Sequence, residues 1–277
     1  HIIQNNIYGV DIERGAVDIA RLRFWLSLIV DEKSPEALPN LDFKIMQGNS
    51  LLEQYKGVDL STMTEKKVGT EQYITIFDSM LDVYRKNLRD KLAEYYVCPN
   101  HDKKMLLRKD IADIVKQELI EQSIDIDFED VDLSANSQFF LWHTWFHDVF
   151  SRPSKEGFDI VIGNPPYVEA KKLKYIASTL KEKFSVYSGT ADLSIYFNEL
   201  GLNILADKGI ISYITTNKFF NTGYGEKVRR QFSSQCINII LNFEQVEVFE
   251  DVLVSSVIFN VSKRNKTPKN MFTYEKF

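Results

Sequence analysis

The hydrophobic residues of the chain change their spacing several times, and these changes predict where strands and helices lie. Residues 6–12 (NIYGVDI) alternate and end at an acidic residue, which predicts a buried strand. Residues 13–30 then place apolar side chains at helical spacing, and residues 42–49 (DFKIMQGN) predict a second strand that ends in a polar turn. A strand, a helix and another strand in this order form the β-α-β unit of a parallel sheet.

A long helical pattern interrupts this α/β pattern between residues 53 and 157. Two runs of helical spacing around a turn at residues 98–103 predict an α-hairpin, followed by an acidic loop at residues 125–132. The aromatic stretch 139–150 (FFLWHTWFHDVF) is expected to pack the insert back onto the sheet. The apolar positions are Ile74, Phe77, Leu81, Tyr84, Leu88, Leu92 and Tyr95 in the first helix, and Leu107, Ile111, Ile114 and Leu119 in the second.

The α/β pattern resumes at residues 158–162 (FDIVI), which predict a short buried strand. The remaining elements expected are a helix at 191–206, a strand at 209–216, a helix at 225–232, a strand at 237–243 and a last strand or hairpin at 252–263. The predicted fold class is α/β, a doubly wound and mostly parallel sheet with a helical insertion. Its three parts are residues 1–52, the insert 53–157 and residues 158–277.

The amino-acid composition indicates a folded protein of the cytoplasm. The chain has 277 residues, 44% of them hydrophobic, and only two cysteines, which fits a folded protein of the reducing cytoplasm. Its longest apolar runs are too short to cross a bilayer, and no signal peptide precedes them. Cys98 and His101 lack a second pair of ligands, so no metal site is expected.

The net charge of −5 is unevenly distributed. Residues 53–157 carry 14 basic and 20 acidic side chains, whereas residues 158–277 carry 15 basic and 12 acidic ones. Phosphate groups are neutralised by Lys and Arg, so nucleic-acid binding is expected in the last part of the chain. That part holds the basic cluster 171–183 (KKLKYIASTLKEK), which on charge alone reads as a solvated helix face.

The most informative short motif follows the strand at residues 158–162. There the chain runs into Asn164-Pro165-Pro166-Tyr167, and the two prolines restrict the backbone so that Asn164 is extended. The Asn164 side-chain oxygen and a proline carbonyl are two acceptors without a competing N–H, a pair that can hold both hydrogens of an NH₂ group. The same acceptors stabilise the positive charge that develops on that nitrogen when it attacks an electrophile. Tyr167 offers a flat face on which a base can stack.

Two other segments are expected at the same edge of the sheet, because ligands of open α/β sheets lie outside the carboxyl ends of the strands. Asp11 ends the first strand and can accept hydrogen bonds from ribose hydroxyls, or it can cap the following helix. Asn49 and Ser50 can contact an adenine edge or simply cap their own turn. The residues alone leave these alternatives open.

The motif and its surroundings resemble the adenine-N6 DNA methyltransferases, and in particular the methylase domain of type IIG restriction–modification enzymes. The strand with GNPPY resembles their catalytic strand and loop, NIYGVDIERGAVDIARLRFWLSL their ribose-binding strand and helix, and IMQGNSLL their adenine-contacting turn. DLSIYFNELGLNIL, GIISYITTNKFF and VFEDVLVSSVIFNV resemble the segments that follow. The insert before FFLWH resembles that of the large methylases of restriction and phage-defence systems.

The resemblance implies a methyltransferase fold, S-adenosylmethionine as cofactor and double-stranded DNA as partner. Asn164 and Pro165, supported by Pro166, would hold the amino group of adenine against the methyl donor. Tyr167 and Phe249 would hold the base after it leaves the duplex, a step that costs a few kcal/mol. The residues implied in cofactor binding are Asp11, Ile12, Asn49, Ser50, Asn164 and Phe197, and those implied in DNA binding are Lys171, Lys172, Lys174 and Lys218.

The sequence departs from the family pattern in three places. The glycine-rich loop that holds the methionine end of the cofactor would precede Ile7 and has no counterpart, and no recognition domain follows the catalytic part. The family aspartate of the adenine-contacting turn is Asn49 here. We therefore expect the 277 residues to be the central fragment of a longer methylase, with weak cofactor binding and no methyl transfer of its own.

Two other functions use the same residues. Enzymes that methylate a glutamine side-chain amide in proteins also carry NPPY, because the planar NH₂ group is held by the same acceptors. A non-catalytic, methylase-like module that binds DNA is the other alternative. The insert and VFEDVLVSSVIF favour the DNA methyltransferase, and the intact NPPY argues against the non-catalytic module.

Overall fold

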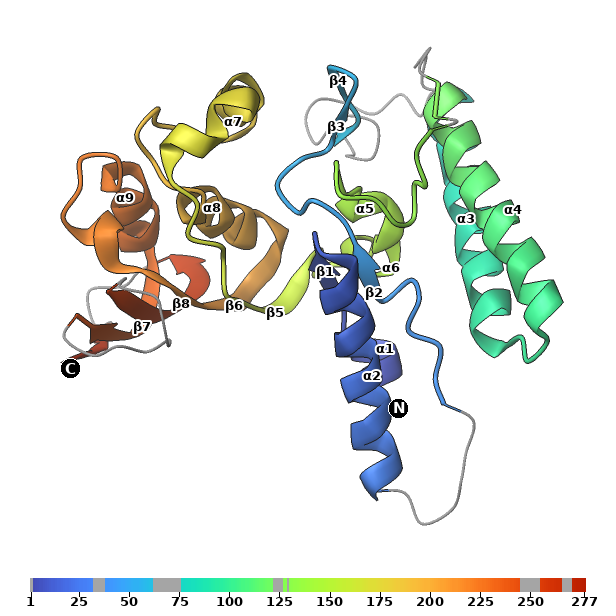
Figure 1. Ribbon diagram of the computed structural model, residues 1–277, viewed down its shortest axis with the longest axis horizontal. Coiled ribbons are helices and arrows are strands. Elements are labelled where there is room, and N and C mark those ends of the chain that lie inside the picture. The colour runs from blue at the N-terminus through green and yellow to red at the C-terminus, as the bar shows by residue number, and fades with distance from the viewer. Residues whose placement is uncertain are drawn as a thin grey trace. The chain divides into compact units, whose positions relative to one another are not determined.

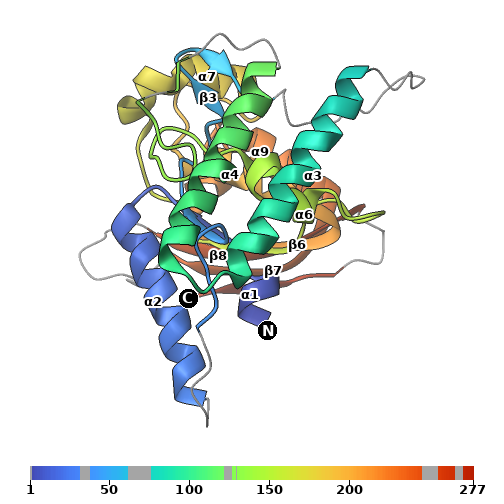
Figure 2. The same cartoon turned by 90° about the vertical axis from the view of Figure 1, so that its right-hand side faces the viewer.

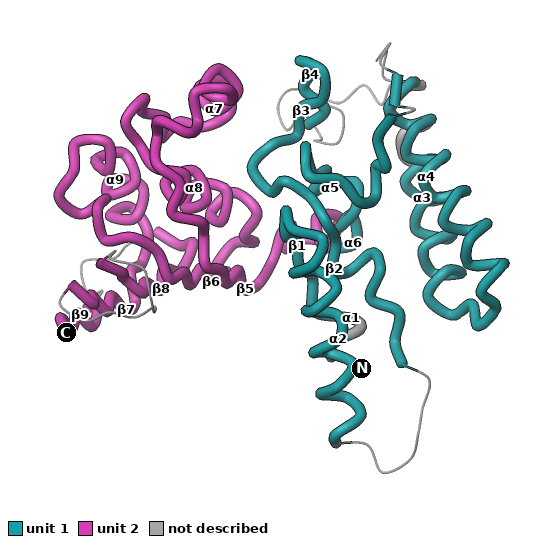
Figure 3. Tube along the Cα trace, viewed as in Figure 1, with its two compact units in different colours: residues 1–148 teal, residues 149–277 magenta. Residues whose placement is uncertain are grey.

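The computed structural model describes residues 2–31, 38–61, 76–121, 127–128, 130–244, 255–265 and 271–277. The chain divides into two compact units, residues 1–148 and residues 149–277 (Figure 3). Each unit is considered by itself below. None of the helices in the described ranges is both long and apolar enough to span a membrane.

Unit 1 begins with the predicted β-α-β unit. Helix α1 (Ile2–Asn6) leads into β1 (Gly9–Asp11), helix α2 (Arg14–Asp31) follows, and β2 (Ile45–Gln47) pairs with β1 in parallel. Val17 of α2 packs into a buried cluster with Leu41 and Ile45, because its side chain lies on the helix face toward the strands. The Arg21 guanidinium donates to the carbonyls of Asp42 and Ile45, which holds α2 against β2.

The insert contributes a small hairpin and two long helices to unit 1. Strands β3 (Gln54–Tyr55) and β4 (Val58–Asp59) pair in antiparallel fashion, and α3 (Ile76–Val97) and α4 (His101–Glu121) form the predicted helical hairpin (Figure 2). Tyr95 joins this hairpin to the first part of the chain. Its hydroxyl donates to the Asp42 carboxylate over 2.5 Å, and its ring packs edge-on against Phe43.

The predicted aromatic stretch packs the insert onto the sheet as expected. Helix α5 (Trp142–Trp145) places the Trp145 ring in a stacked contact with Phe43, and Phe146 packs edge-on against Tyr8. The Trp142 ring nitrogen donates to the Ser50 carbonyl. The helix α6 (His147–Phe150) follows, and the division between the units falls within it.

Unit 2 is built on a five-stranded sheet with the order β5-β6-β8-β7-β9 (Figure 1). Parallel pairs join β5 to β6 and β7 to β9, whereas β8 runs antiparallel to both of its neighbours. The strands are β5 (Phe158–Gly163), β6 (Leu205–Thr216), β7 (Gln235–Phe243), β8 (Ser256–Asn265) and β9 (Thr273–Lys276).

The described helices that follow β5 lie in the two connections from β5 to β6 and from β6 to β7. They are the 3₁₀ helix η2 (Ala170–Ile176), α7 (Ala177–Lys183), α8 (Ser194–Ile204), the 3₁₀ helix η3 (Asn217–Phe220) and α9 (Glu226–Ser234). Figure 1 shows α8 and α9 on the same side of the sheet. Buried aromatic rings fill the space beneath them, with Phe259 of β8 contacting Tyr213, Phe219 and Phe232.

The α/β class with parallel pairing and a helical insertion is confirmed. The boundaries differ from the predicted ones by a few residues. At the first strand, residue 6 ends α1 and β1 covers only three residues. That strand is half-buried and exposed at Asp11, so the prediction of a buried strand over residues 6–12 is wrong. A strand of three residues in a two-stranded sheet has few neighbouring side chains to bury it.

The strand before the Asn-Pro-Pro-Tyr motif is also less buried than predicted. β5 forms where expected, but Ile160 and Ile162 are 64% and 77% exposed. Among the described residues β5 pairs only with β6, which makes it an edge strand. Side chains alternate along a strand, so Ile160 and Ile162 project from the same face. A β-branched composition predicts that the segment forms a strand, but it does not predict which other elements bury that strand.

The helical hairpin contains a buried carboxyl group. Glu118 of α4 is only 3% exposed, and its nearest charged partner, Arg85 of α3, lies 3.9 Å away. Burial raises the pKa of Glu118 to about 7, and the attraction of Arg85 opposes the shift only in part. Between the ordinary glutamate pKa and this value the folded chain binds more protons than the unfolded chain. The free energy of unfolding therefore falls as the pH rises through that window.

Replacing this carboxyl by a neutral amide is expected to remove that pH dependence. Between roughly pH 4.5 and 7.5 the free energy of unfolding of the wild-type protein should fall by up to about 3 kcal/mol relative to that of Glu118→Gln. The variant has no carboxyl group that titrates at this position. Urea denaturation of both proteins across this range measures the shift. Asp113→Asn, on an exposed site of the same helix, serves as the control. A pH-independent difference for Glu118→Gln would contradict the assignment.

Candidate functional site

The carboxyl ends of β1 and β2 are joined by backbone and side-chain hydrogen bonds. The Gly48 N–H donates to the Asp11 carbonyl over 2.9 Å, and the Gln47 side-chain amide donates to the Ile12 carbonyl over 3.1 Å. The segments that carry Asp11 and Asn49 therefore lie side by side, as their positions at the ends of parallel strands predict. Their convergence is confirmed within unit 1.

Asp11 has one carboxylate oxygen engaged and one available. Its Oδ1 accepts the Glu13 N–H over 2.8 Å, which caps the start of α2. The side chain is exposed, and the second oxygen has no hydrogen-bond partner among the described residues. The two roles left open by the sequence are thus compatible, because capping uses one oxygen and leaves the other for a ligand.

Asn49 and Ser50 form a turn beyond the end of β2. The Asn49 Oδ1 accepts the Leu51 N–H over 3.2 Å, so this side chain caps its own turn and leaves its NH₂ group as a donor. The Ser50 carbonyl accepts the Trp142 ring N–H over 2.9 Å, which ties the turn to the insert. Both residues are half-buried.

Gly48 allows this turn to approach the insert closely. A Cβ at residue 48 would lie 2.5 Å from a ring carbon of Phe140, a distance that real contacts do not reach. Phe140 itself is buried, and its N–H donates to the Leu52 carbonyl over 2.8 Å. The close approach of Phe140 is the reason why only glycine fits at this position.

The Asn-Pro-Pro-Tyr segment leaves the carboxyl end of β5 in unit 2. Asn164 and Pro166 are exposed, Pro165 is buried and Tyr167 is half-buried. Just before the motif, a Cβ at Gly163 would lie 3.1 Å from the Tyr213 ring, so the strand end packs tightly against β6. The Asn164 amide thus stands at the surface on a backbone that a buried proline fixes beneath it.

The far end of this segment is held by the residues that precede α8. The Leu193 N–H donates to the Val168 carbonyl over 2.9 Å. The neighbouring Asp192 carboxylate accepts from the Ser194 N–H and hydroxyl and, over 3.1 Å, from the Tyr224 hydroxyl. Asp192 and Tyr224 are not predicted as site residues by the sequence reasoning. The position of Asp192 immediately before a helical pattern is the only signal that marks it.

A buried glutamate of α8 holds the loop that leads into this helix. Both carboxylate oxygens of Glu199 accept backbone N–H groups, from Ser185 over 3.0 Å and from Val186 over 2.9 Å. The Lys227 ammonium donates to the carbonyl of Ser185 over 2.8 Å. These contacts fix the start of α8, whose second turn carries the half-buried Phe197.

The two tyrosines near Asp192, Tyr167 and Tyr224, have raised pKa values. Burial raises the pKa of Tyr167, and the Asp192 carboxylate adds to the shift, whereas the Ser256 hydroxyl opposes it. Burial and the same carboxylate raise the pKa of Tyr224 to about 12. Both hydroxyls are therefore neutral at physiological pH, and Tyr167 presents an uncharged ring.

The remaining predicted site residues are distributed over unit 2. Lys171, Lys172 and Lys174 are exposed on η2, and Lys218 is exposed on η3. Phe249 lies outside the described residues, so its role stays a prediction. Within the described ranges no three His, Cys, Asp or Glu side chains cluster in a way that holds a metal ion.

Comparison with known proteins assigns the family. The model of the Eco57I restriction-modification methylase family matches residues 5–249, which is most of the chain. The chain therefore belongs to the Eco57I restriction-modification methylase family.

Individual relatives agree with this assignment. A predicted type II restriction enzyme and methyltransferase of Methanocaldococcus jannaschii is 23% identical over 97% of this chain and 26% of its own length. The type II methyltransferase M.XhoI of Xanthomonas vasicola is 32% identical over 34% of this chain and 18% of its own length. The chain spans about a quarter or less of the length of the curated relatives it matches.

Solved structures that resemble the chain are more distant. A predicted class I S-adenosylmethionine-dependent methyltransferase of Listeria monocytogenes is 14% identical, with a TM-score of 0.34 over 96% of this chain and 75% of its own. The type IIL restriction-modification enzyme MmeI in complex with DNA is 12% identical, with a TM-score of 0.37 over 59% of this chain and 23% of its own.

A side chain at residue 48 is expected to push Phe140 away from the turn that follows β2. Gly48→Ala forces Phe140 to move and should lower the free energy of unfolding by about 1–3 kcal/mol, the usual cost of overpacking a core. Gly15→Ala is the matched control, because a Cβ there meets no atom within 4 Å. Denaturation of both variants measures the effect. Equal stability of the two variants would show that Phe140 moves away freely.

Proposed function

We propose that this chain carries the catalytic chemistry of a DNA methyltransferase that transfers a methyl group to the N6 amino group of adenine, within a restriction-modification or phage-defence enzyme of the cytoplasm. The observation that carries the proposal is the exposed Asn164 amide on a strand end that is followed by two prolines and a tyrosine. Membership of the Eco57I methylase family supports methyl transfer as the reaction class.

The chain's own residues supply the chemistry of the amino group. The Asn164 side-chain oxygen and the Pro165 carbonyl would each accept one hydrogen of the adenine NH₂. Positive charge develops on that nitrogen as its lone pair forms the new bond, and the two acceptors stabilise it. A separate general base is not needed to explain this stabilisation, since the methylated amino group would release one proton to solvent water after the charge has formed.

S-adenosylmethionine, when bound, would supply the activated methyl group. The residues at the carboxyl ends of β1 and β2 fit its nucleoside portion, because the free oxygen of Asp11 can accept from ribose hydroxyls. The family aspartate is Asn49 here, and its Oδ1 is already engaged by the Leu51 N–H. Asn49 would therefore donate its NH₂ to an adenine ring nitrogen, where an aspartate would accept. Ile12, Ser50 and Phe197 would line the same nucleoside, and Asn164 would face the methyl group.

DNA would be the partner of the exposed residues in unit 2. Tyr167 and Phe249 would stack on an adenine that has left the duplex, where each stacking contact contributes about 1–3 kcal/mol. Lys171, Lys172, Lys174 and Lys218 would neutralise phosphates beside it. The neutral ring of Tyr167 is suited to such stacking, and its raised pKa keeps the hydroxyl protonated to a higher pH than that of an ordinary tyrosine.

Removal of the Asn164 amide tests the proposal. In the complete enzyme Asn164→Ala should lower the turnover of methyl transfer to DNA by roughly 10²-fold or more, with a much smaller change in the dissociation constant of S-adenosylmethionine. Asn203→Ala, at an exposed position of α8, is the matched control. Turnover within a few-fold of wild type for Asn164→Ala would exclude this residue from the chemistry.

A further inference from the structure

None of the residues assigned to methyl transfer lines a small pocket in unit 1, although Gln47 of its lining donates to the Ile12 carbonyl. It has a volume of about 60 Å³ and is formed by the start of α2, the end of β2, helix α4 and the loop at residues 134–135. A water molecule occupies roughly 10–15 Å³ of such volume, so the pocket holds about four oxygen-sized groups. This is the size of one tetrahedral oxyanion.

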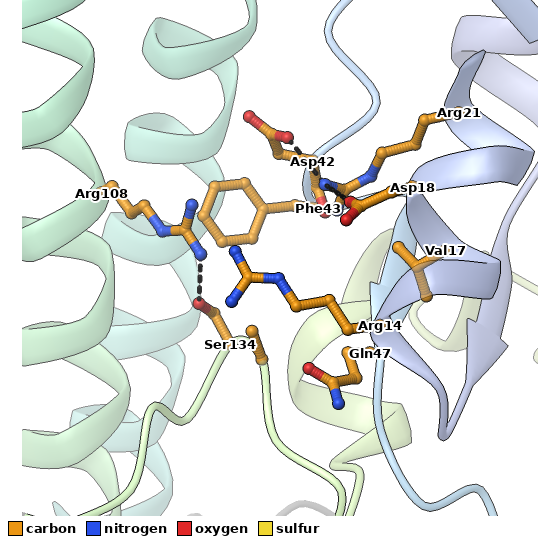
Figure 4. Close-up of a pocket in the computed structure, with 10 residues that line it drawn as sticks. Arg14, Val17, Asp18, Arg21, Asp42, Phe43, Gln47, Arg108 and Ser134 are labelled. Carbon is orange, nitrogen blue, oxygen red and sulfur yellow. Dashed lines mark hydrogen bonds and ion pairs between the residues drawn. The ribbon is translucent and has the colours of Figure 1, made fainter.

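Three arginines line this pocket, two of them from α2 and one from α4 (Figure 4). Arg14 begins α2, Arg21 lies two turns further along the same helix, and Arg108 comes from α4. Figure 4 shows the guanidinium groups of Arg14 and Arg108 pointing toward one another, with Ser134 beside them. Like charges that face each other across a small space repel unless an anion lies between them.

The carboxylates around the pocket are already paired with other groups. Asp42 lies 3.2 Å from the Arg21 guanidinium and accepts from the Tyr95 hydroxyl. Asp18 is also nearest to Arg21, at 4.0 Å, and Asp132 lies 3.6 Å from Arg108.

Arg14 is the arginine of this pocket that forms no ion pair among the described residues, because Asp18 and Asp42 both lie nearest to Arg21 and Asp132 lies nearest to Arg108. It has no ion-pair or hydrogen-bond partner among the described residues, and it is an exposed residue that lines the pocket. Arg108 also keeps donors free, since its contact to the Ser134 hydroxyl uses only one terminal nitrogen over 3.4 Å. Planar guanidinium groups match the oxygen spacing of phosphate and bind it by paired hydrogen bonds.

We propose that this pocket binds a phosphate group between Arg14 and Arg108. The insert carries more acidic than basic side chains, and Arg108 is the basic side chain of the insert that lines the pocket. The bound group would join α2 to the helical hairpin, because the two arginines belong to different elements. The site is independent of the proposed methyl transfer, which uses none of these residues.

Inorganic phosphate is the probe that tests the site. At constant ionic strength, phosphate should raise the melting temperature of the complete chain in a saturable manner that chloride does not reproduce. Arg14→Gln and Arg108→Gln should each weaken phosphate binding about tenfold or more, the effect of losing a charge-assisted hydrogen bond. Arg14→Lys should retain part of the affinity.

Arg23→Gln is the matched control, because Arg23 is an exposed arginine of α2 that does not line the pocket. An equal loss in Arg23→Gln, or no stabilisation by phosphate beyond that of chloride, would overturn the proposal. Arg14→Gln alone decides the matter if Arg108→Gln fails to fold, since Arg14 makes no contact that the fold needs.

The source of the phosphate is distinguished with duplex DNA. If the group belongs to a DNA backbone, Arg14→Gln should lower DNA affinity and reduce the slope of log affinity against log salt by about one, whereas Arg23→Gln should not. If the site takes a free phosphate, Arg14→Gln should lose phosphate binding while DNA affinity stays unchanged. Either result supports the site, and retention of both affinities in Arg14→Gln contradicts it.

Discussion

Proline has no backbone N–H, and the proposed chemistry of this protein depends on that constraint. After β5 the chain places Asn164 before two prolines, so the backbone around its amide offers acceptors without a neighbouring donor. The surrounding contacts hold this arrangement in place. Pro165 is buried, Gly163 lies against the Tyr213 ring, and the Val168 carbonyl accepts the Leu193 N–H. The loop is therefore anchored at both ends, with Asn164 left at the surface.

At the carboxyl ends of β1 and β2, too, some polar atoms hold the backbone in place while others stay available for a ligand. Asp11 uses one oxygen to cap α2 and Asn49 uses its oxygen to cap its own turn, so both side chains are oriented before any ligand arrives. Gly48 brings this turn against Phe140 of the insert, and Trp142 donates to the Ser50 carbonyl. The aromatic stretch of the insert thus supports the segment proposed to bind the nucleoside.

Much of this could be predicted from the sequence, and the exceptions have physical reasons. The spacing of hydrophobic residues and the β-branched composition predict β5, the helical hairpin and the strands β6 and β7. Both signals lie within the residues of each element and do not depend on its neighbours in space. Burial depends on what packs against an element, which explains why Ile160 and Ile162 are exposed in a run that reads as a core strand. Asp192 and Glu199 were not predicted because they bind groups distant in the sequence, the Tyr224 hydroxyl and the N–H groups of Ser185 and Val186. Arg14 was not predicted because the proposed phosphate site also needs Arg108 of another helix.

The NH₂ group that Asn164 and Pro165 are proposed to hold belongs, in this proposal, to adenine in DNA. The complete enzyme can be incubated with duplex DNA and S-adenosylmethionine that carries an isotopically labelled methyl group, and the products identified by mass spectrometry of digested DNA and protein. We expect the label to be recovered in N6-methyldeoxyadenosine. Recovery of the label in another nucleoside, or on a glutamine side chain of a protein, would contradict it.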